Sequence, residues 1–182
     1  LYLAVGDPQA PAAYSRLDAV LTQRDADSPE RLRAVLMERL EQRPEDARAR
    51  VILGRLERGL GRPAEAAENL ERAITDSRKV ANDPQVLSEL ADTLGVLHGG
   101  RLAGRPAELA GRALTLDPRH PKALELAGSA AVEQGDYRRA IGYWQRLLAQ
   151  LSAESPRRAE LEAALRRLER RADLQYPEAG GF

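Results

Sequence analysis

The chain has 182 residues, and its 28 basic and 28 acidic side chains leave no formal net charge. This balance argues against a nucleic-acid-binding domain, because such a domain usually gathers a basic excess on one face. Cysteine is absent, which excludes a thiol nucleophile, a disulfide framework, a Cys-ligated metal and haem attachment to the chain itself. The abundance of Ala, Leu, Arg and Glu favours a folded helical domain.

Apolar residues recur with the period of amphipathic helices along most of the chain, for example over residues 66–74. A capping side chain followed by proline marks three helix starts, at Ser28-Pro29, Asp83-Pro84 and Ser155-Pro156. Asp136 is a further expected N-cap, and Gly61 and Gly135 are expected to end helices. The sequence predicts helices over residues 12–24, 28–43, 46–60, 63–77, 83–98, 105–116, 120–134, 136–151 and 156–173.

Three of these helices carry a small residue at matching positions. Gly54, Ala91 and Gly128 follow one another at intervals of 37 residues. A tetratricopeptide repeat (TPR) is a helix–turn–helix unit of about 34 residues with a small residue where its two helices approach closely. The segment 98–106 contains three glycines, and we predict that about three residues inserted there lengthen the interval.

These patterns predict an all-α fold, a superhelical array of about three TPR repeats with capping helices at both ends. We expect Trp144 and Tyr137 to pack in its core. The expected divisions are an irregular lead-in (1–11), N-terminal capping helices (12–44), three repeats within 45–152 (45–78, 83–118 and 120–152), a C-terminal capping helix (155–174) and a frayed tail (175–182).

The sequence contains no converging set of catalytic groups. Its two histidines, His98 and His120, fall in turn regions, and we expect both at the surface. The Gly99-Gly100 pair lacks both the GxGxxG pattern and a preceding strand, so it does not indicate a phosphate site. We therefore predict a domain that is not an enzyme and has no cofactor, metal site or catalytic residue.

A TPR array offers a groove lined by the first helix of each repeat, which can hold an extended or helical peptide. We expect this groove to be basic near the first repeat and acidic near the third. Ordinary solvated helix surface is the alternative for each residue. The predicted groove residues are Arg48, Val51, Arg55, Arg58, Ser88, Asp92, Val96, Lys122, Glu125, Ser129, Val132 and Glu133.

Several segments resemble one particular family, the apocytochrome-binding subunit of bacterial c-type cytochrome biogenesis, in its periplasmic TPR domain. The resemblance covers roughly residues 1–173, and the inserted glycine-rich loop is more specific than the general TPR pattern. The similar segments are Tyr2, Gly6-Asp7-Pro8, residues 82–87, 104–109, 113–124, 135–137, 140–141 and 143–148.

This resemblance implies that the domain captures apocytochrome c, largely through the guest's C-terminal helix, and presents it to the haem-ligation complex. It also implies a periplasmic domain of an inner-membrane protein. Because the chain starts at Leu1 and not at Met, we expect it to be a fragment whose membrane anchor lies upstream. No nucleic-acid partner is expected.

Two other functions stay open at this point. A structural TPR scaffold in another envelope-assembly or secretion complex would form stable protein complexes without a preference for cytochrome peptides. An enzyme would require a convergent polar site in the folded chain.

Overall fold

The computed structural model describes residues 28–175, so the predicted lead-in, the helix predicted over 12–24 and the tail after Gln175 lie outside it. All the helices predicted within the described part are present, with ends that differ by a few residues. The helices are α2 (Pro29–Gln42), α3 (Ala47–Gly59), α4 (Pro63–Asp76), α5 (Arg78–Ala81), α6 (Pro84–Leu97), α7 (Arg105–Leu116), α8 (Pro121–Glu133), α9 (Tyr137–Leu148) and α10 (Pro156–Gln175).

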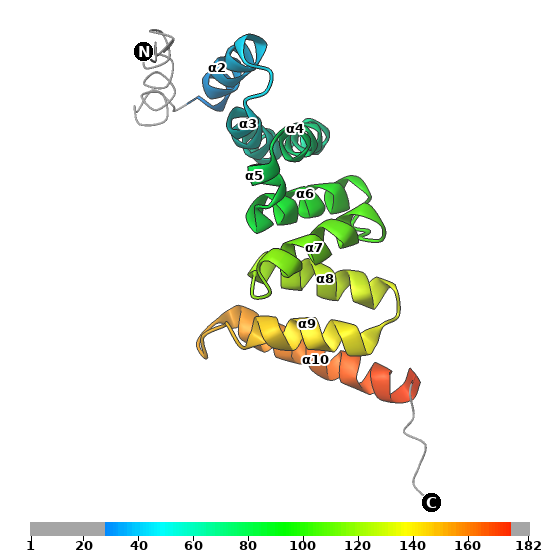
Figure 1. Cartoon of the computed structure of the whole chain (residues 1–182). Coiled ribbons are helices and arrows are strands. Elements are labelled where there is room, and N and C mark those ends of the chain that lie inside the picture. Colours follow the sequence, from blue (N-terminus) through cyan, green and yellow to red (C-terminus); the bar gives the residue numbers. More distant parts are fainter. Residues whose placement is uncertain (1–27, 176–182) are drawn as a thin grey trace, which may run out of the picture.

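The helices stack as successive pairs along one axis, from α2 at one end to α10 at the other (Figure 1). Helix α3 packs on α4, α6 on α7 and α8 on α9, while contacts of α4 with α6 and of α7 with α8 join neighbouring pairs. Helix α2 covers α3, and α10 covers α9. This confirms the predicted TPR array with a capping helix at each end of the described chain.

Small residues allow the two helices of a pair to approach closely, as the repeat pattern predicts. A methyl group placed on Gly54 would lie 2.9 Å from Cγ of Leu70 on the partner helix. Ala91 is completely buried. A methyl group on Gly128 would overlap the indole ring of Trp144. The side chain of the second helix therefore occupies the space that a larger residue on the first helix would need.

The predicted helix stops are confirmed, and so are two of the predicted caps. Gly61 and Gly135 adopt positive φ angles of 72° and 74°, a conformation that glycine reaches without the steric cost of a Cβ atom. The Asp83 carboxylate accepts hydrogen bonds from the first turn of α6, and Asp136 accepts one from the Arg139 N–H of α9.

The cap expected at Ser28 is wrong. Its side chain makes no capping hydrogen bond to the backbone of α2. The hydroxyl instead donates to the Glu30 carboxylate at 3.0 Å, because a charged oxygen is the stronger acceptor for an O–H donor. Pro29 still opens the helix, as predicted.

The 37-residue interval has two separate causes, of which the sequence indicated one. Between Ala91 and Gly128, the loop 98–104 joins α6 to α7, where the other two pairs need only 60–62 and 134–136. Between Gly54 and Ala91, the extra length lies instead after α4, in a linker that forms the short helix α5. Helix α5 was not predicted, because four residues are too few to show a helical period.

The core is one continuous cluster through the three pairs, with a smaller cluster near each end. The central cluster includes the fully buried Leu87, Leu90, Leu109 and Leu124. Leu36 of α2 packs with Ala49 and Leu53, and Leu168 of α10 packs with Ala131 and Ala140. Tyr137 and Trp144 pack against the second of these small clusters, as expected.

We predict that Gly128→Ala destabilises the array by about 1–3 kcal/mol, because the added methyl group cannot fit beside Trp144. Gly142→Ala in α9 is the matched control, since no atom lies within 4 Å of the added methyl group. It should raise stability by about 0.5–1 kcal/mol through the helix preference of alanine. Urea unfolding followed by circular dichroism measures both, and equal effects would contradict the close-packing argument.

A second prediction concerns Asp46, the N-cap of α3. Burial raises the pKa of its carboxyl, but hydrogen bonds from the Ala49 N–H and from Arg39 outweigh burial and leave this pKa below its ordinary value. Because the pKa is lowered in the folded state, the ionised Asp46 carboxylate stabilises the protein at neutral pH. This stabilisation is lost as the pH falls through the folded-state pKa.

The variant Asp46→Asn keeps a capping side chain but loses the charge. We therefore expect it to be less stable than the wild type at pH 7, with the difference shrinking as the pH is lowered below the ordinary carboxyl range. Urea unfolding across this pH range checks the prediction. A difference between the two proteins that is constant with pH would contradict it.

Candidate peptide-binding surface

The first helices of the three pairs, α3, α6 and α8, carry the predicted groove residues, and we call their outward side the first-helix face. Five of these residues are exposed: Arg48, Arg55, Arg58, Val96 and Glu133. Five more are half-buried: Asp92, Lys122, Glu125, Ser129 and Val132.

Two predicted groove residues are buried and do not reach this surface. Val51 is 7% exposed and belongs to the central core. Ser88 is completely buried, and its hydroxyl donates to the Pro84 carbonyl at 2.7 Å. The prediction was wrong for both, because each side chain is covered by neighbouring helices that a single helix's pattern does not reveal.

Ion pairs connect α3 to α6 across the first-helix face. Arg55 Nε donates to the Glu89 carboxylate at 2.8 Å. One turn further along both helices, Arg58 lies 3.8 Å from the Asp92 carboxylate. Two of the three arginines predicted at the basic end of the groove are therefore matched by acidic groups of the next pair.

The same pattern continues from α6 to the C-terminal helix. Lys122 Nζ of α8 lies 2.9 Å from Asp92 and 3.9 Å from Glu125. Glu125 in turn accepts a hydrogen bond from Arg157 of α10. We call the whole series the ion-pair ladder; its members are Arg55, Glu89, Arg58, Asp92, Lys122, Glu125 and Arg157.

The ladder contradicts the predicted gradient from a basic to an acidic end. Each cation of the series lies beside a carboxylate of an adjacent helix, so charge alternates along the face. Apart from Arg55–Glu89, whose carboxylate is buried, these pairs are at the surface and contribute only about 0–1 kcal/mol each. Replacing one of these surface pairs by contacts with a bound guest therefore costs little free energy. Because charge alternates along the face, the face favours a guest that carries both acidic and basic side chains.

A chain of partly buried hydrogen bonds runs from His120 to the Arg55–Glu89 pair of the ladder. Nδ1 of His120 accepts the Ala123 N–H at 3.2 Å, which caps α8, so the ring proton sits on Nε2 and is donated to Gln85 Oε1 at 3.1 Å. The Gln85 amide donates to Glu89 at 2.7 Å, and Glu89 also accepts from Arg55. This chain links α8, α6 and α3.

The expectation that both histidines lie at the surface is half right. His98 is exposed, but His120 is only 8% exposed. The capping role was not predicted, although it acts over only three residues, because histidine is not among the usual N-cap residues. The contact with Gln85, 35 residues earlier, depends on the packing of α8 against α6.

Glu133, one of the predicted groove residues, also has a structural role. Its carboxylate accepts the backbone N–H groups of Leu102 at 2.9 Å and Ala103 at 3.1 Å. Leu102 is 7% exposed and sits against Gly95, where an added methyl group would lie 2.7 Å from it. The inserted loop is thus fastened by one apolar side chain and one carboxylate.

We predict that Glu133→Ala loosens this loop, because the two N–H groups lose a charged acceptor. The expected loss of stability is about 1–3 kcal/mol, with faster amide hydrogen exchange at Leu102 and Ala103. The control Glu68→Ala removes an exposed glutamate that has no hydrogen bond or ion pair in the described part of the chain. Unchanged exchange in Glu133→Ala would show that the carboxylate does not hold the loop.

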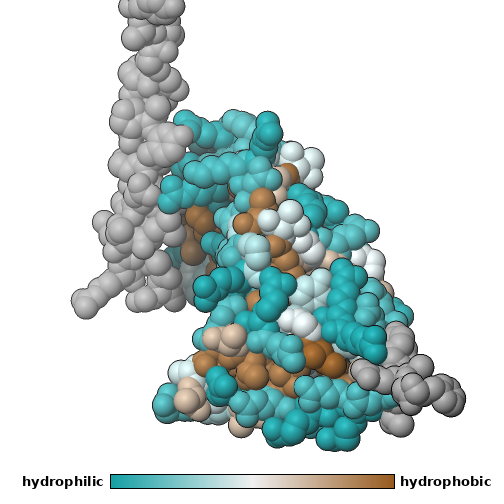
Figure 2. Space-filling model, turned by 60° about the horizontal axis from the view of Figure 1, so that its bottom comes forward, coloured by the Kyte–Doolittle hydropathy of each residue, from teal (hydrophilic) through white to brown (hydrophobic). Residues whose placement is uncertain are grey.

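The charged side chains of residues 28–175 do not form a metal-binding cluster. In that range no three His, Asp or Glu side chains are grouped as metal ligands would be. None of the described helices combines the length and apolar character needed to cross a membrane. Figure 2 shows a largely hydrophilic surface on which hydrophobic side chains gather in a few patches.

Stacked helix pairs, close-packed at small residues and presenting a charged first-helix face, define a TPR domain of the protein-binding type. The family model of the cytochrome c-type biogenesis protein H TPR domain matches residues 9–158. The chain therefore belongs to this family.

Two relatives carry the name cytochrome c-type biogenesis protein CycH. The protein of Pseudomonas aeruginosa is 33% identical over 144 residues, which are 79% of this chain and 35% of that protein. The protein of Bradyrhizobium diazoefficiens is 27% identical over 175 residues, which are 92% of this chain and 45% of that protein. The chain thus spans less than half the length of either relative.

The solved structures show the fold alone. A tetratricopeptide repeat protein from Parabacteroides merdae superposes with a TM-score of 0.69 at 16% sequence identity. The match covers 92% of this chain and 62% of that one. At this identity the match supports the TPR architecture and not a particular partner.

Proposed function

We propose that this domain captures apocytochrome c by the guest's C-terminal helix and holds it for haem ligation during cytochrome c maturation. The observation that carries the proposal is membership of the cytochrome c-type biogenesis TPR family over residues 9–158. A TPR domain contributes binding surface to such a process, which fits a holder that leaves the haem chemistry to other subunits.

The first-helix face has features that suit an amphipathic helix as the guest. The ion-pair ladder offers both signs of charge along its length, and Val96 is 63% exposed beside it. Val132, half-buried on α8, adds a second apolar contact. Apolar anchors spaced along a helix, with charges at their flanks, are the usual requirement for helix-in-groove recognition.

The proposal includes a setting. The domain would lie in the periplasm as part of an inner-membrane protein anchored upstream of Leu1, and would deliver its guest to subunits of the haem-ligation complex. These features come from the family resemblance.

Calorimetry with a peptide that copies the C-terminal helix of a c-type cytochrome tests the proposal. We expect a dissociation constant of about 1 μM or lower, corresponding to ~8 kcal/mol. A scrambled peptide of the same composition is the control. If no heat of binding is detected while circular dichroism shows the helices intact, the proposal is wrong. A structural scaffold would instead form stable complexes without preferring this peptide.

A matched pair of variants tests where the guest binds. Val96→Asp places a charge on the first-helix face. It should weaken binding of the cytochrome peptide about tenfold, since burying a carboxylate against an apolar side chain of the guest costs free energy. Leu116→Asp changes a similarly exposed apolar residue, 45% exposed on α7, a second helix of a pair. It should leave binding unchanged, and equal losses in both variants would place the guest elsewhere.

A further inference from the structure

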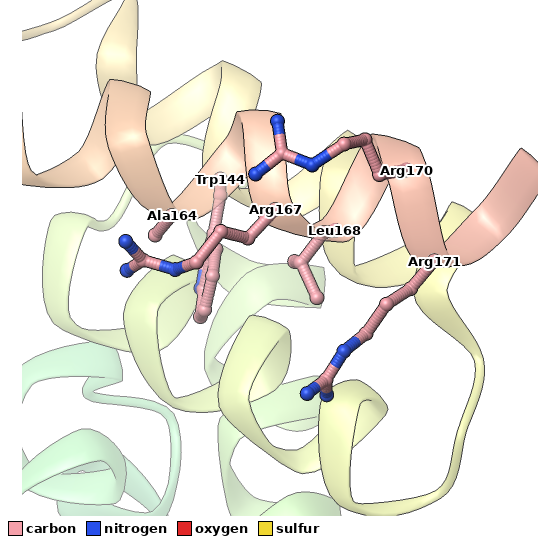
Figure 3. Close-up of a pocket in the computed structure, with 6 residues that line it drawn as sticks. All are labelled: Trp144, Ala164, Arg167, Leu168, Arg170 and Arg171. Atoms are coloured by element: carbon pink, nitrogen blue, oxygen red, sulfur yellow. The ribbon is translucent and has the colours of Figure 1, made fainter.

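A cavity of about 460 Å³ lies between α9 and α10 at the C-terminal end of the array. Trp144 of α9, together with Ala164 and Leu168 of α10, forms its apolar part. Three arginines of α10 complete the lining, and Figure 3 shows their guanidinium groups extending around the hollow. We call this cavity the arginine pocket; its arginines are Arg167, Arg170 and Arg171.

The indole ring of Trp144 in the pocket is held in place by contacts with α8. Trp144 is half-buried against Gly128, where any side chain would overlap it. Its Nε1 donates to the Glu125 carbonyl of α8 at 3.4 Å. Glu125 is also a member of the ion-pair ladder. The pocket is therefore preformed, and it adjoins the end of the first-helix face.

The charges of the pocket differ from those of the ladder. Every cation of the ladder lies within 4 Å of a carboxylate. The three pocket arginines are exposed, and within residues 28–175 none forms an ion pair. Arg171 instead lies over the Tyr137 ring, 6.0 Å from its centroid. Unmatched positive charge is thus concentrated around an apolar hollow.

We propose that the arginine pocket binds an acidic, apolar segment of a polypeptide guest, with an apolar side chain against Trp144 and Leu168 and carboxylates paired with the arginines. The planar guanidinium group binds a carboxylate through two parallel hydrogen bonds, which gives this pairing its geometry. The inference rests on the proposed function in that it extends the same guest-binding surface beyond the ladder.

Charge and shape favour a polypeptide over the other anionic partners. A nucleic acid needs further cations along its backbone, whereas the cations of the adjoining ladder already lie beside carboxylates. A membrane presents a broad surface to a protein, whereas this site is a hollow of side-chain dimensions with a fixed aromatic residue inside. A short peptide helix can place one apolar side chain and its acidic neighbours there together.

Trp144 is the only tryptophan of the chain, so its fluorescence reports directly on the pocket. The probes are two helix-forming peptides with the same leucine stripe, one with glutamates beside it and one with glutamines. We expect the acidic peptide to shift the emission and to bind about tenfold more tightly than the neutral one. This preference should decrease with added salt.

The triple variant Arg167→Gln, Arg170→Gln, Arg171→Gln should lose the preference. The matched control removes the same charge at Arg72→Gln, Arg119→Gln and Arg166→Gln, which lie outside the pocket, and should keep it. Circular dichroism verifies that both variants are folded. Equal binding of the two peptides, or an unchanged preference in the pocket variant, would overturn the proposal.

Two further measurements separate the alternatives. If Trp144 fluorescence changes with phosphatidylserine vesicles but not with the acidic peptide, the pocket binds lipid. If the fluorescence change follows self-association measured by sedimentation, the pocket binds a second copy of the chain. Either result overturns the proposal. If the cytochrome peptide binds but no acid preference is found, the pocket inference fails alone; if only the designed acidic peptide binds, the guest proposed above is wrong.

Discussion

The close approach of paired helices at small residues is the constraint on which the remainder of this structure depends. At Gly54 and Gly128 the partner helix places Leu70 and Trp144 in the space that a side chain would fill. Because these contacts determine how near the two helices lie, they also determine where the next pair can dock. The first-helix face and the arginine pocket are both consequences of this spacing.

The charged side chains of the first-helix face connect helices that are far apart in the sequence. Arg55 and Glu89 are 34 residues apart, and Gln85 and His120 are 35 residues apart. The Arg55–Glu89 ion pair joins the first helix pair to the second, and the Gln85–His120 hydrogen bond joins the second to the third. Exposed ion pairs add little stability, whereas the bonds to the buried Glu89 and His120 satisfy polar groups that would be costly to leave unpaired.

The inserted loop illustrates how an irregular repeat is accommodated. Leu102 supplies an apolar anchor, and the Glu133 carboxylate accepts the loop's backbone N–H groups. The loop therefore belongs to the packed structure of the array, although it departs from the ordinary TPR pattern. Helix α5 lengthens the preceding interval at a different place, in the linker after α4, so the two equal intervals of 37 residues arise from different structures.

The sequence by itself determined the helices, their order and the repeat, because these depend on local signals. Helical periodicity, proline at a first helical position and glycine with positive φ all act within a few residues. These signals also predicted the tight contacts at Gly54 and Gly128. They sufficed for the architecture and for most of the exposed residues of the first-helix face.

Only the tertiary structure decided which side chains meet across repeats. It buried Val51 and Ser88, joined His120 to Gln85, turned Glu133 to the loop and paired the charges into a ladder. The physical reason is that such contacts depend on the rotation between successive helix pairs, a property of the packed array that no single helix encodes. The same rotation left three arginines of α10 around Trp144 without carboxylates from the described chain.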